Sequence, residues 1–330
     1  MIIYKADLPT LLEATARDTQ VLVPLDFQGG VRFAPWSAGC NPRFDVQNSK
    51  VPPKGALLPA TEPLYSWDAS ENGLAFNQAP LDDASRVLFG VRPCDAAAIE
   101  RLDSVFLEDG YVDEFYEARR SALCIVAMAC AQAGSACFCE SMGLNPNEAP
   151  NADVLLREGQ DAYEVIAQTE HGQKLVESWK SFTHDGQANA PETHCSLSAD
   201  MTGVAEKLPS LFESDLWEEV ADSCLTCGTC TFTCPTCYCF DISQDKRASR
   251  GSRFRCWDSC MFPTYTLMAG GHNPRARKSQ RIRQRFMHKL CFFEQRYNSS
   301  LCVGCGRCIE NCPAAVDITE LIKKIGAREV

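Results

Sequence analysis

The sequence predicts an α+β protein with an N-terminal α/β domain over residues 1–182 and an α-helical domain over residues 201–330. In the first part, short apolar runs alternate with helical patterns, which is typical of a parallel sheet with crossover helices. Residues 183–200 are polar and aperiodic, so we interpret them as a linker. From about residue 201 onward, apolar residues recur mainly at helical spacing.

The clearest unit of the N-terminal part is a strand, a helix and a second strand. Residues 87–91 and 123–128 are continuous apolar runs, and residues 95–106 between them place apolar side chains on one helical face. This order predicts two parallel strands joined by a helix. The other expected elements are a helix over 7–17, a strand over 21–23, irregular structure with short strands over 28–80, strands over 154–156 and 163–167, and a helix over 170–179.

Helical signals dominate the C-terminal part. Asp215 can cap a helix that leads to Cys224, and Asp317 with Glu320 resembles a capping box at the start of a last helix. An apolar stripe at helical spacing predicts a further helix between them, and it consists of Ile282, Phe286, Leu290 and Phe293. We therefore expect a long helical insert between two groups of cysteines.

Those cysteines form two runs with the spacing C-x2-C-x2-C-x3-C-P, beginning at Cys224 and Cys302. This is the ligand spacing of two cubane iron–sulfur clusters, in which the fourth cysteine of each run binds the other cluster. The proline redirects the chain after that cysteine. We assign one 4Fe-4S cluster to Cys224, Cys227, Cys230 and Cys312, and a second to Cys302, Cys305, Cys308 and Cys234. The C-terminal part is then an α-helical ferredoxin domain with two 4Fe-4S cluster motifs.

Zinc is the alternative metal for these cysteines. Structural zinc sites usually have two C-x2-C pairs well apart in the sequence, whereas here four cysteines fall within eleven positions, twice. Two complete runs, each closed by Cys-Pro, therefore favour two 4Fe-4S clusters over two zinc ions.

Composition restricts the class of protein further. Cysteine accounts for 20 of the 330 residues, and the N-terminus has neither the long apolar stretch nor the cleavage site of an export signal. The cysteines therefore indicate metal ligands in a reducing cytoplasm rather than disulfides. No run of eighteen apolar residues is present, so the sequence predicts no membrane span. Clusters of this type point to anaerobic metabolism.

Four further cysteines could converge on a third cluster. Cys94 follows the strand at 87–91 and Cys130 follows the strand at 123–128, while Cys137 and Cys139 come soon after. The ends of neighbouring parallel strands lie side by side, and a helix start at Cys94 favours a thiolate. The spacing matches no fixed template, so buried inert thiols and a zinc site are the alternatives.

The remaining cysteines fall into two classes. Cys237, Cys239 and Cys260 could supply additional cluster ligands, or they could pack as S–H groups beside the first two clusters, since no fourth ligand can be placed. Five cysteines have no neighbours at ligand spacing, and we interpret them as structural: Cys40, Cys124, Cys195, Cys256 and Cys291.

Charge is distributed unevenly along the chain. The net charge is −11, yet residues 246–289 hold twelve Lys or Arg residues against one acid, Asp258. These cations could stabilise an anionic cluster and raise its potential, dock an acidic partner, or simply form a solvated face. Arg281, Arg285 and Lys289 flank the predicted apolar stripe. Nucleic-acid binding is disfavoured because the aromatic interleaving of a stacking surface is missing.

Motifs for other chemistries are missing. The sequence has no G-x-G-x-x-G after a strand, no P-loop and no nucleophile elbow, and its five histidines are isolated from one another. We therefore expect no nicotinamide site, phosphate cradle or acyl-transfer site in this chain. A flavin site is not excluded, because flavin pockets have more varied sequences than these motifs.

The order of the motifs resembles that of the iron–sulfur subunit family found in cytoplasmic sulfhydrogenase, as its β subunit, and in anaerobic sulfite reductase. The motifs are Arg92-Pro93-Cys94-Asp95, residues 137–143, residues 234–239, residues 257–261, residues 269–272 and residues 302–308. The resemblance runs from about residue 85 to the end. It implies a protein without a substrate of its own. In that family, electrons pass between a flavin subunit that handles NAD(P)H and a catalytic subunit, either a nickel–iron hydrogenase or a sirohaem sulfite reductase.

The residues and the resemblance together predict an electron-transfer subunit of a cytoplasmic multi-subunit oxidoreductase. It would relay electrons through 4Fe-4S clusters within a hetero-oligomer, with no nucleic-acid or membrane partner. One alternative is a flavin-bearing catalytic iron–sulfur subunit whose N-terminal domain performs the substrate step. A second is a zinc-stabilised module whose basic stretch binds nucleic acid.

Overall fold

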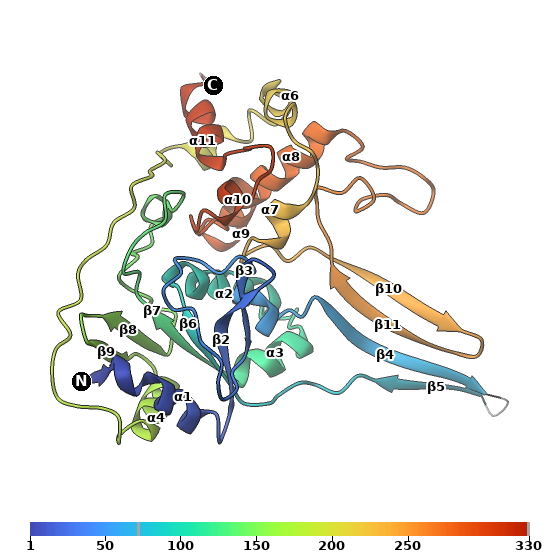
Figure 1. The fold of residues 1–330 in the computed structure, drawn as a ribbon. Coiled ribbons are helices and arrows are strands. Elements are labelled where there is room, and N and C mark those ends of the chain that lie inside the picture. Colours follow the sequence, from blue (N-terminus) through green and yellow to red (C-terminus); the bar gives the residue numbers. More distant parts are fainter. Residues whose placement is uncertain (71–72, 329–330) are drawn as a thin grey trace.

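The structure is a computed structural model, which describes residues 1–70 and 73–328 (Figure 1). A seven-stranded sheet forms the N-terminal part, and its four central strands, β8, β7, β6 and β2, run parallel. The three edge strands pair antiparallel. In spatial order the strands are β1 (Ile2–Tyr4), β9 (Ala162–Ala167), β8 (Val154–Glu158), β7 (Leu123–Met128), β6 (Arg86–Val91), β2 (Gln20–Phe27) and β3 (Gly30–Pro35).

Helices cover both faces of this sheet. The helices α1 (Leu8–Thr15) and α4 (Glu170–Ser178) pack on one face, and α2 (Pro93–Phe106) and α3 (Glu114–Ser121) pack on the other. Strand β7 is buried throughout, because its side chains alternate between the two cores. Three single 3-10 turns complete this part, at Lys5–Asp7, Pro53–Ala56 and Cys139–Met142.

A second sheet projects from the molecule as an arm, to the right in Figure 1. Its four strands are all antiparallel, and in order they are β10 (Phe240–Arg247), β11 (Arg250–Trp257), β4 (Thr61–Ser70) and β5 (Gly73–Gln78). The insert between the cysteine runs was expected to be helical, and this expectation is wrong over 240–257. The physical reason is that β4, from the N-terminal part, supplies the pairing edge for β11.

Buried charges hold the root of the arm against α3. Glu62 on β4 forms ion pairs with Arg119 on α3 and with Arg255 on β11. Arg255 also pairs with Asp113 at the start of α3. The side chains of Glu62, Arg119 and Arg255 are all less than a tenth exposed. Paired charges therefore fix β11, from the C-terminal half of the chain, to β4 and α3, from the N-terminal half.

Short helices surround the two cysteine runs at the C-terminal end (top of Figure 1). They are α5 (Val204–Lys207), α6 (Leu216–Ala221), α7 (Thr229–Phe232), α8 (Lys278–Met287), α9 (Phe293–Tyr297), α10 (Arg307–Glu310) and α11 (Ile318–Ala327). The predicted stripe of Ile282, Phe286, Leu290 and Phe293 is buried. A π-helical turn, His288–Phe292, joins α8 to α9. As predicted, the Asp317 carboxylate caps α11 by accepting a hydrogen bond from Thr319 N at 2.7 Å.

The segment predicted as a linker, 183–200, contains no helix and only a single bridge, between His184 and Ile2. It is nevertheless held in place. Thr193 N donates to Asn147 Oδ1 at 2.8 Å, and the Thr193 hydroxyl donates to the carbonyl of Ala131 at 3.0 Å. The segment thus lies against the loops that follow β7 rather than hanging free between two domains.

Candidate iron–sulfur sites

The first set of thiols, Cys224, Cys227, Cys230 and Cys312, lines one cavity. Cys224 follows α6, Cys230 lies in α7 and Cys312 follows α10. The loop between them requires glycine at position 228, where φ is 78° and a Cβ would stand 2.7 Å from the Phe262 ring. The fourth cysteine of the second run therefore lies with three cysteines of the first run.

Hydrogen-bond donors point at these sulfur atoms. Thr226 N donates to Cys224 at 3.3 Å, Val316 N donates to Cys312 at 3.3 Å, and Arg285 Nε donates to Cys230 at 3.2 Å. The Thr229 hydroxyl, 3.3 Å from Cys227, lowers the pKa of that exposed thiol. Donors of this kind stabilise the thiolate form, which is the form that binds iron.

The second set, Cys302, Cys305, Cys308 and Cys234, is more enclosed than the first. Burial, together with the neighbouring thiols Cys308 and Cys234, raises the pKa of Cys302 to about 11. Burial likewise raises the pKa of Cys305, and Cys234 and Cys308 act on it in the same direction. Each thiol is thus close enough to feel the charge of others in the set, as four ligands around one cluster must be.

A lysine in the π-helical turn donates a hydrogen bond to a thiol of the second set. Lys289 Nζ is buried and donates to Cys234 Sγ at 3.2 Å and to the Thr236 hydroxyl at 2.9 Å. An S–H bond donated by Cys237 and the nearby Lys289 cation hold the pKa of Cys234 well below its usual range. A buried ammonium group beside a thiol suits an anionic cluster, because it offsets part of the cluster charge.

The third set, Cys94, Cys130, Cys137 and Cys139, lines a separate cavity, here called the third cavity. Cys94 and Cys130 lie just beyond the carboxyl ends of β6 and β7, which pair in parallel. These two residues therefore lie at the same edge of the sheet. Cys137 and Cys139 reach the cavity from the loop after β7.

Cys195 also lines the third cavity, with its sulfur 3.5 Å from that of Cys139. Its position differs from the expectation of a merely structural cysteine, which arose because Cys195 lies 56 residues from Cys139 in an aperiodic segment. Hydrogen bonds bring it there: Cys195 N donates to Glu140 Oε2 at 2.5 Å, and Ala199 N donates to the Ser141 hydroxyl at 2.9 Å. The third cavity is thus lined by six cysteines where four were expected, because Cys195 and a member of the second set, Cys305, join the other four.

Arg92 contributes a buried cation to the wall of the third cavity. Its guanidinium donates to three main-chain carbonyls, those of Ala129, Phe44 and Val46, at 3.1, 2.6 and 2.6 Å. Within the part of the chain that the structure describes, Arg92 forms no ion pair with a carboxylate. A buried positive charge without a carboxylate partner fits a cavity that holds an anionic group.

Cys237, Cys239 and Cys260 lie together beside the second set. The neighbouring Cys260 lowers the pKa of Cys239 to about 6, and the neighbouring Cys237 lowers the pKa of Cys234. Lys54 Nζ lies over this group and donates to the Cys237 carbonyl at 2.7 Å. The three thiols are paired with one another or with Cys234, so the arrangement suits packed S–H groups as well as additional ligands.

The distances between sulfur atoms bear on the choice of metal. Four thiolates around one zinc ion lie about 3.8 Å apart, because the Zn–S bond is about 2.3 Å long. Among residues 1–70 and 73–328, no three cysteine sulfur atoms lie within 4.8 Å of one another. The thiols of each set are therefore spaced too widely to surround a single zinc ion.

The basic segment 246–289 divides into an inner and an outer part. Arg281, Arg285 and Lys289 are buried, and two of them contact cysteine sulfur atoms. Arg281 instead donates to main-chain carbonyls, including that of Met261 at 3.0 Å. On the arm, Lys246, Arg247 and Arg250 are exposed. Of the inner cations, Arg285 and Lys289 thus contact the thiol sets, whereas the outer cations form a solvated face.

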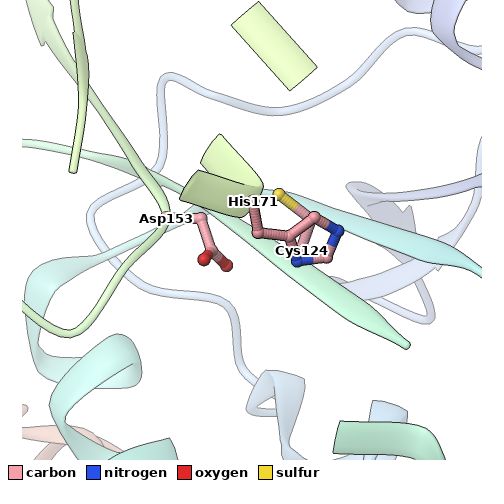
Figure 2. Close-up of side chains that lie close together, drawn as sticks. All are labelled: Cys124, Asp153 and His171. Atoms are coloured by element: carbon pink, nitrogen blue, oxygen red, sulfur yellow. The ribbon is translucent and has the colours of Figure 1, made fainter. Parts of the chain in front are cut away.

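One other group of potential metal ligands in the described residues lies at the amino ends of the parallel strands, away from the third cavity. Figure 2 shows Cys124 on β7, Asp153 before β8 and His171 on α4 side by side, with ligand atoms within 4.8 Å. The Asp153 carboxylate already accepts hydrogen bonds from Ile125 N at 2.8 Å and from the Thr169 hydroxyl at 2.6 Å. These bonds join β7, β8 and the start of α4, so we interpret the group as structural.

Comparisons with known proteins agree with the thiol geometry. Residues 223–316 match the family described as a 4Fe-4S dicluster domain. Sulfhydrogenase 2 subunit beta of Pyrococcus furiosus is 35% identical over 297 residues, which cover 86% of this chain and 85% of that protein. The chain belongs to the sulfhydrogenase beta-subunit family. It is an iron–sulfur, metal-binding protein of the oxidoreductase-subunit type.

Three further findings concern this family member. No solved structure matches the chain. In the described residues, no helix is both long and apolar enough to cross a membrane. All twenty cysteines are free of disulfide bonds, so every thiol of the three sets is available as a ligand.

Proposed function

We propose that this beta-subunit relative relays electrons through 4Fe-4S clusters, between a flavin subunit that uses NAD(P)H and a catalytic subunit of the hydrogenase or sulfite reductase type. The first and second sets of thiols would each hold one cluster, and the third set a further one. When bound, the clusters supply one-electron redox chemistry. The protein residues hold them, limit contact with water and set their potentials.

The observation that carries this proposal is the crossed arrangement of the two runs. Cys312 lines the first cavity although it belongs to the second run, and Cys234 lies among the thiols of the second run although it belongs to the first. Two clusters bound in this way share their ligand loops and lie next to each other. Neighbouring clusters suit transfer of single electrons better than substrate chemistry.

The family supports the choice of partners proposed for this chain. The curated relative is named as one subunit of a sulfhydrogenase, and we propose a similar hetero-oligomer with a redox catalytic subunit for this chain. The cytoplasmic location expected from the free cysteines stays a prediction. Purification under anaerobic conditions, followed by identification of the proteins that co-purify, tests the choice of partners.

The test of the relay uses the complex and one ligand variant. The anaerobic wild-type protein should be brown, should lose colour with dithionite, and should contain about eight iron atoms from the first two sets alone. Cys305→Ala removes a ligand of the second set, so it should lose about four iron atoms. It should also reduce electron flow from NAD(P)H to the terminal acceptor at least tenfold.

Cys256→Ala is the matched control, because Cys256 lies on β11 and lines none of the three thiol sets. It should keep full iron content and full electron flow. A colourless wild-type protein that contains zinc would contradict the proposal, as would full electron flow in Cys305→Ala with its iron lost.

A further inference from the structure

The second set of thiols lies between the other two cavities. Cys308, a member of the second set, also lines the first cavity. Cys305, another member, also lines the third cavity. Two thiols of one set therefore face the two neighbouring sites, while no cysteine lines both the first and the third cavity.

The loops of the second and third sets are in direct main-chain contact. Phe138 N donates to the Gly304 carbonyl at 2.9 Å. A Cβ at Gly304, where φ is 60°, would stand 2.6 Å from the Cα of Cys139, and a Cβ at Gly306 would stand 2.6 Å from the Ala136 carbonyl oxygen. Only glycine allows this approach, so the loop that carries Cys305 is held against the loop that carries Cys139.

Side chains from the N-terminal and C-terminal parts of the chain also hold these two loops together. Arg307 and Asp95, each about 1% exposed, form a two-pronged ion pair at 2.7 and 2.8 Å. Asn48 Nδ2 donates to the Cys305 carbonyl at 2.8 Å and lies 3.8 Å from Cys137 Sγ. Cys94 packs against Cys305 in a small apolar cluster. These buried contacts hold the loop that carries Cys305 against the residues of the third set.

From this arrangement we infer that the three thiol sets form a linear chain, in the order third set, second set, first set, with the second set in the middle. The inference rests on the proposed function. Each step moves one electron: the donor cluster is oxidised by one electron, its neighbour is reduced by one, and no bond or proton moves. Electrons reach the chain from a reduced flavin or another low-potential donor.

The first set is an end of this chain, because it opens to solvent. Cys227 is exposed, and the side chain of Leu225 between the first two ligands is 64% exposed. The third set is the other end, close to the parallel sheet. A partner protein that docks at either end can then exchange electrons with the middle set only through the end set nearest to it.

Magnetic interaction between reduced clusters tests this order in the full-length protein. Cys227→Ala should remove the first cluster, Cys137→Ala the third and Cys305→Ala the second, each with loss of about four iron atoms. After reduction by dithionite, electron paramagnetic resonance should show spin–spin broadening in Cys227→Ala and in Cys137→Ala, since each keeps a neighbouring pair. Cys305→Ala should show two separate, unbroadened signals.

Two outcomes would overturn the order: broadening that survives in Cys305→Ala, or two unbroadened signals in Cys227→Ala or Cys137→Ala. If Cys305→Ala does not fold, as judged by circular dichroism, the other two variants decide the order alone. Wild-type protein with about eight iron atoms, unchanged in Cys137→Ala, would overturn the three-set chain and leave the proposed function standing. Wild-type protein without iron would contradict the proposed function itself. Cys256→Ala is again the control and should match the wild type in iron content and signal shape.

Discussion

Arg285 and Lys289 lie one turn apart on the helix that begins at Lys278, and each points a buried cation at a cysteine sulfur. Arg285 contacts Cys230 of the first set, and Lys289 contacts Cys234 of the second. A positive charge next to a thiolate ligand stabilises the more negative, reduced form of a cluster. We therefore expect these two side chains to raise the potentials of the clusters that they adjoin.

Arg285→Met should lower the reduction potential of the first cluster, because it removes this charge and keeps most of the side-chain volume. We expect a change of about 60 mV, which corresponds to a tenfold change in a one-electron equilibrium constant. A redox titration followed by electron paramagnetic resonance measures it. Arg281→Met is the control, since Arg281 contacts only main-chain carbonyls and its loss should leave the potential unchanged. Equal shifts in both variants would contradict the role of Arg285.

His288 gives the stability a dependence on pH. Burial and the nearby cations Lys289 and Arg275 lower the pKa of His288 to about 4, and its Nε2 lies 3.0 Å from the Tyr238 hydroxyl. The unfolded chain binds a proton below about pH 6.5, whereas the folded chain does not until about pH 4. The free energy of unfolding should therefore fall as the pH drops through this window, by at most about 3 kcal/mol.

Urea unfolding under anaerobic conditions at several pH values measures this effect. His288→Gln keeps a polar group near Tyr238 but does not titrate, so its unfolding midpoint should change less between about pH 6.5 and about pH 4.5 than that of the wild type. Parallel pH profiles for the two proteins would show that His288 is not the group responsible.

Spacing in the sequence identifies a ligand only when the ligands are close along the chain. Spacing alone predicted the two sets of four cysteines; the first four line one cavity, and Cys234 and Cys308 lie near Cys302 and Cys305, but their role as ligands stays a prediction. Cys195 could not be assigned from spacing. Hydrogen bonds to Glu140 and Ser141 bring it close to Cys139, and these contacts have no periodic pattern in the sequence. The inward direction of Arg285 was equally hidden, since a residue beside an apolar stripe can face either solvent or a buried site.

The arm is the element that joins the two halves of the chain most directly. Strand β11 pairs along β4 from Cys256 and Thr61 to Arg250 and Asp68, although these strands lie far apart in the sequence. Helices such as α2 and α11 were predictable because their apolar spacing and caps are local signals. The pairing between β4 and β11 was not predictable. The sequence of a strand indicates which side chains share a face, but it does not indicate which other strand will pair with it.

Glu62→Gln should destabilise the protein by about 3–5 kcal/mol, because it leaves the buried cations Arg119 and Arg255 without their shared carboxylate. Thermal unfolding of the anaerobic protein, followed by circular dichroism, measures the loss. Asp68→Asn on the same strand is the control: its partner Arg250 is exposed and 4.0 Å away, so we expect a change below about 0.5 kcal/mol. Similar midpoints for the two variants would contradict a structural role for the buried charges.

The whole molecule consists of a parallel-sheet part and a cluster-binding part that meet at the second and third thiol sets. The main contacts across this junction are the Arg307–Asp95 ion pair and the close approach at Gly304 and Gly306. Along the sequence, the polar and aperiodic segment 183–200 separates the two parts. The sites themselves are nevertheless built across that boundary, from residues such as Cys195 and Asn48.

Asp95→Asn should weaken this junction, because Arg307 would then be a buried cation without a charged partner. We expect a loss of about 3–5 kcal/mol in the free energy of unfolding, and faster release of iron to a chelator. Glu100→Gln on the same helix, α2, is the control, since Glu100 is about half exposed and pairs only with surface neighbours. Equal chelation rates in the two variants would contradict the role of Asp95.

The enclosure of the second set constrains how the protein is made. Cys234 and Cys305 are buried, and the loop with Phe138 and Cys139 rests directly on Gly304. Iron and sulfide delivered from outside must reach these thiols while that loop is still lifted away. We therefore expect the second set to be loaded with iron before the parallel-sheet part packs against it.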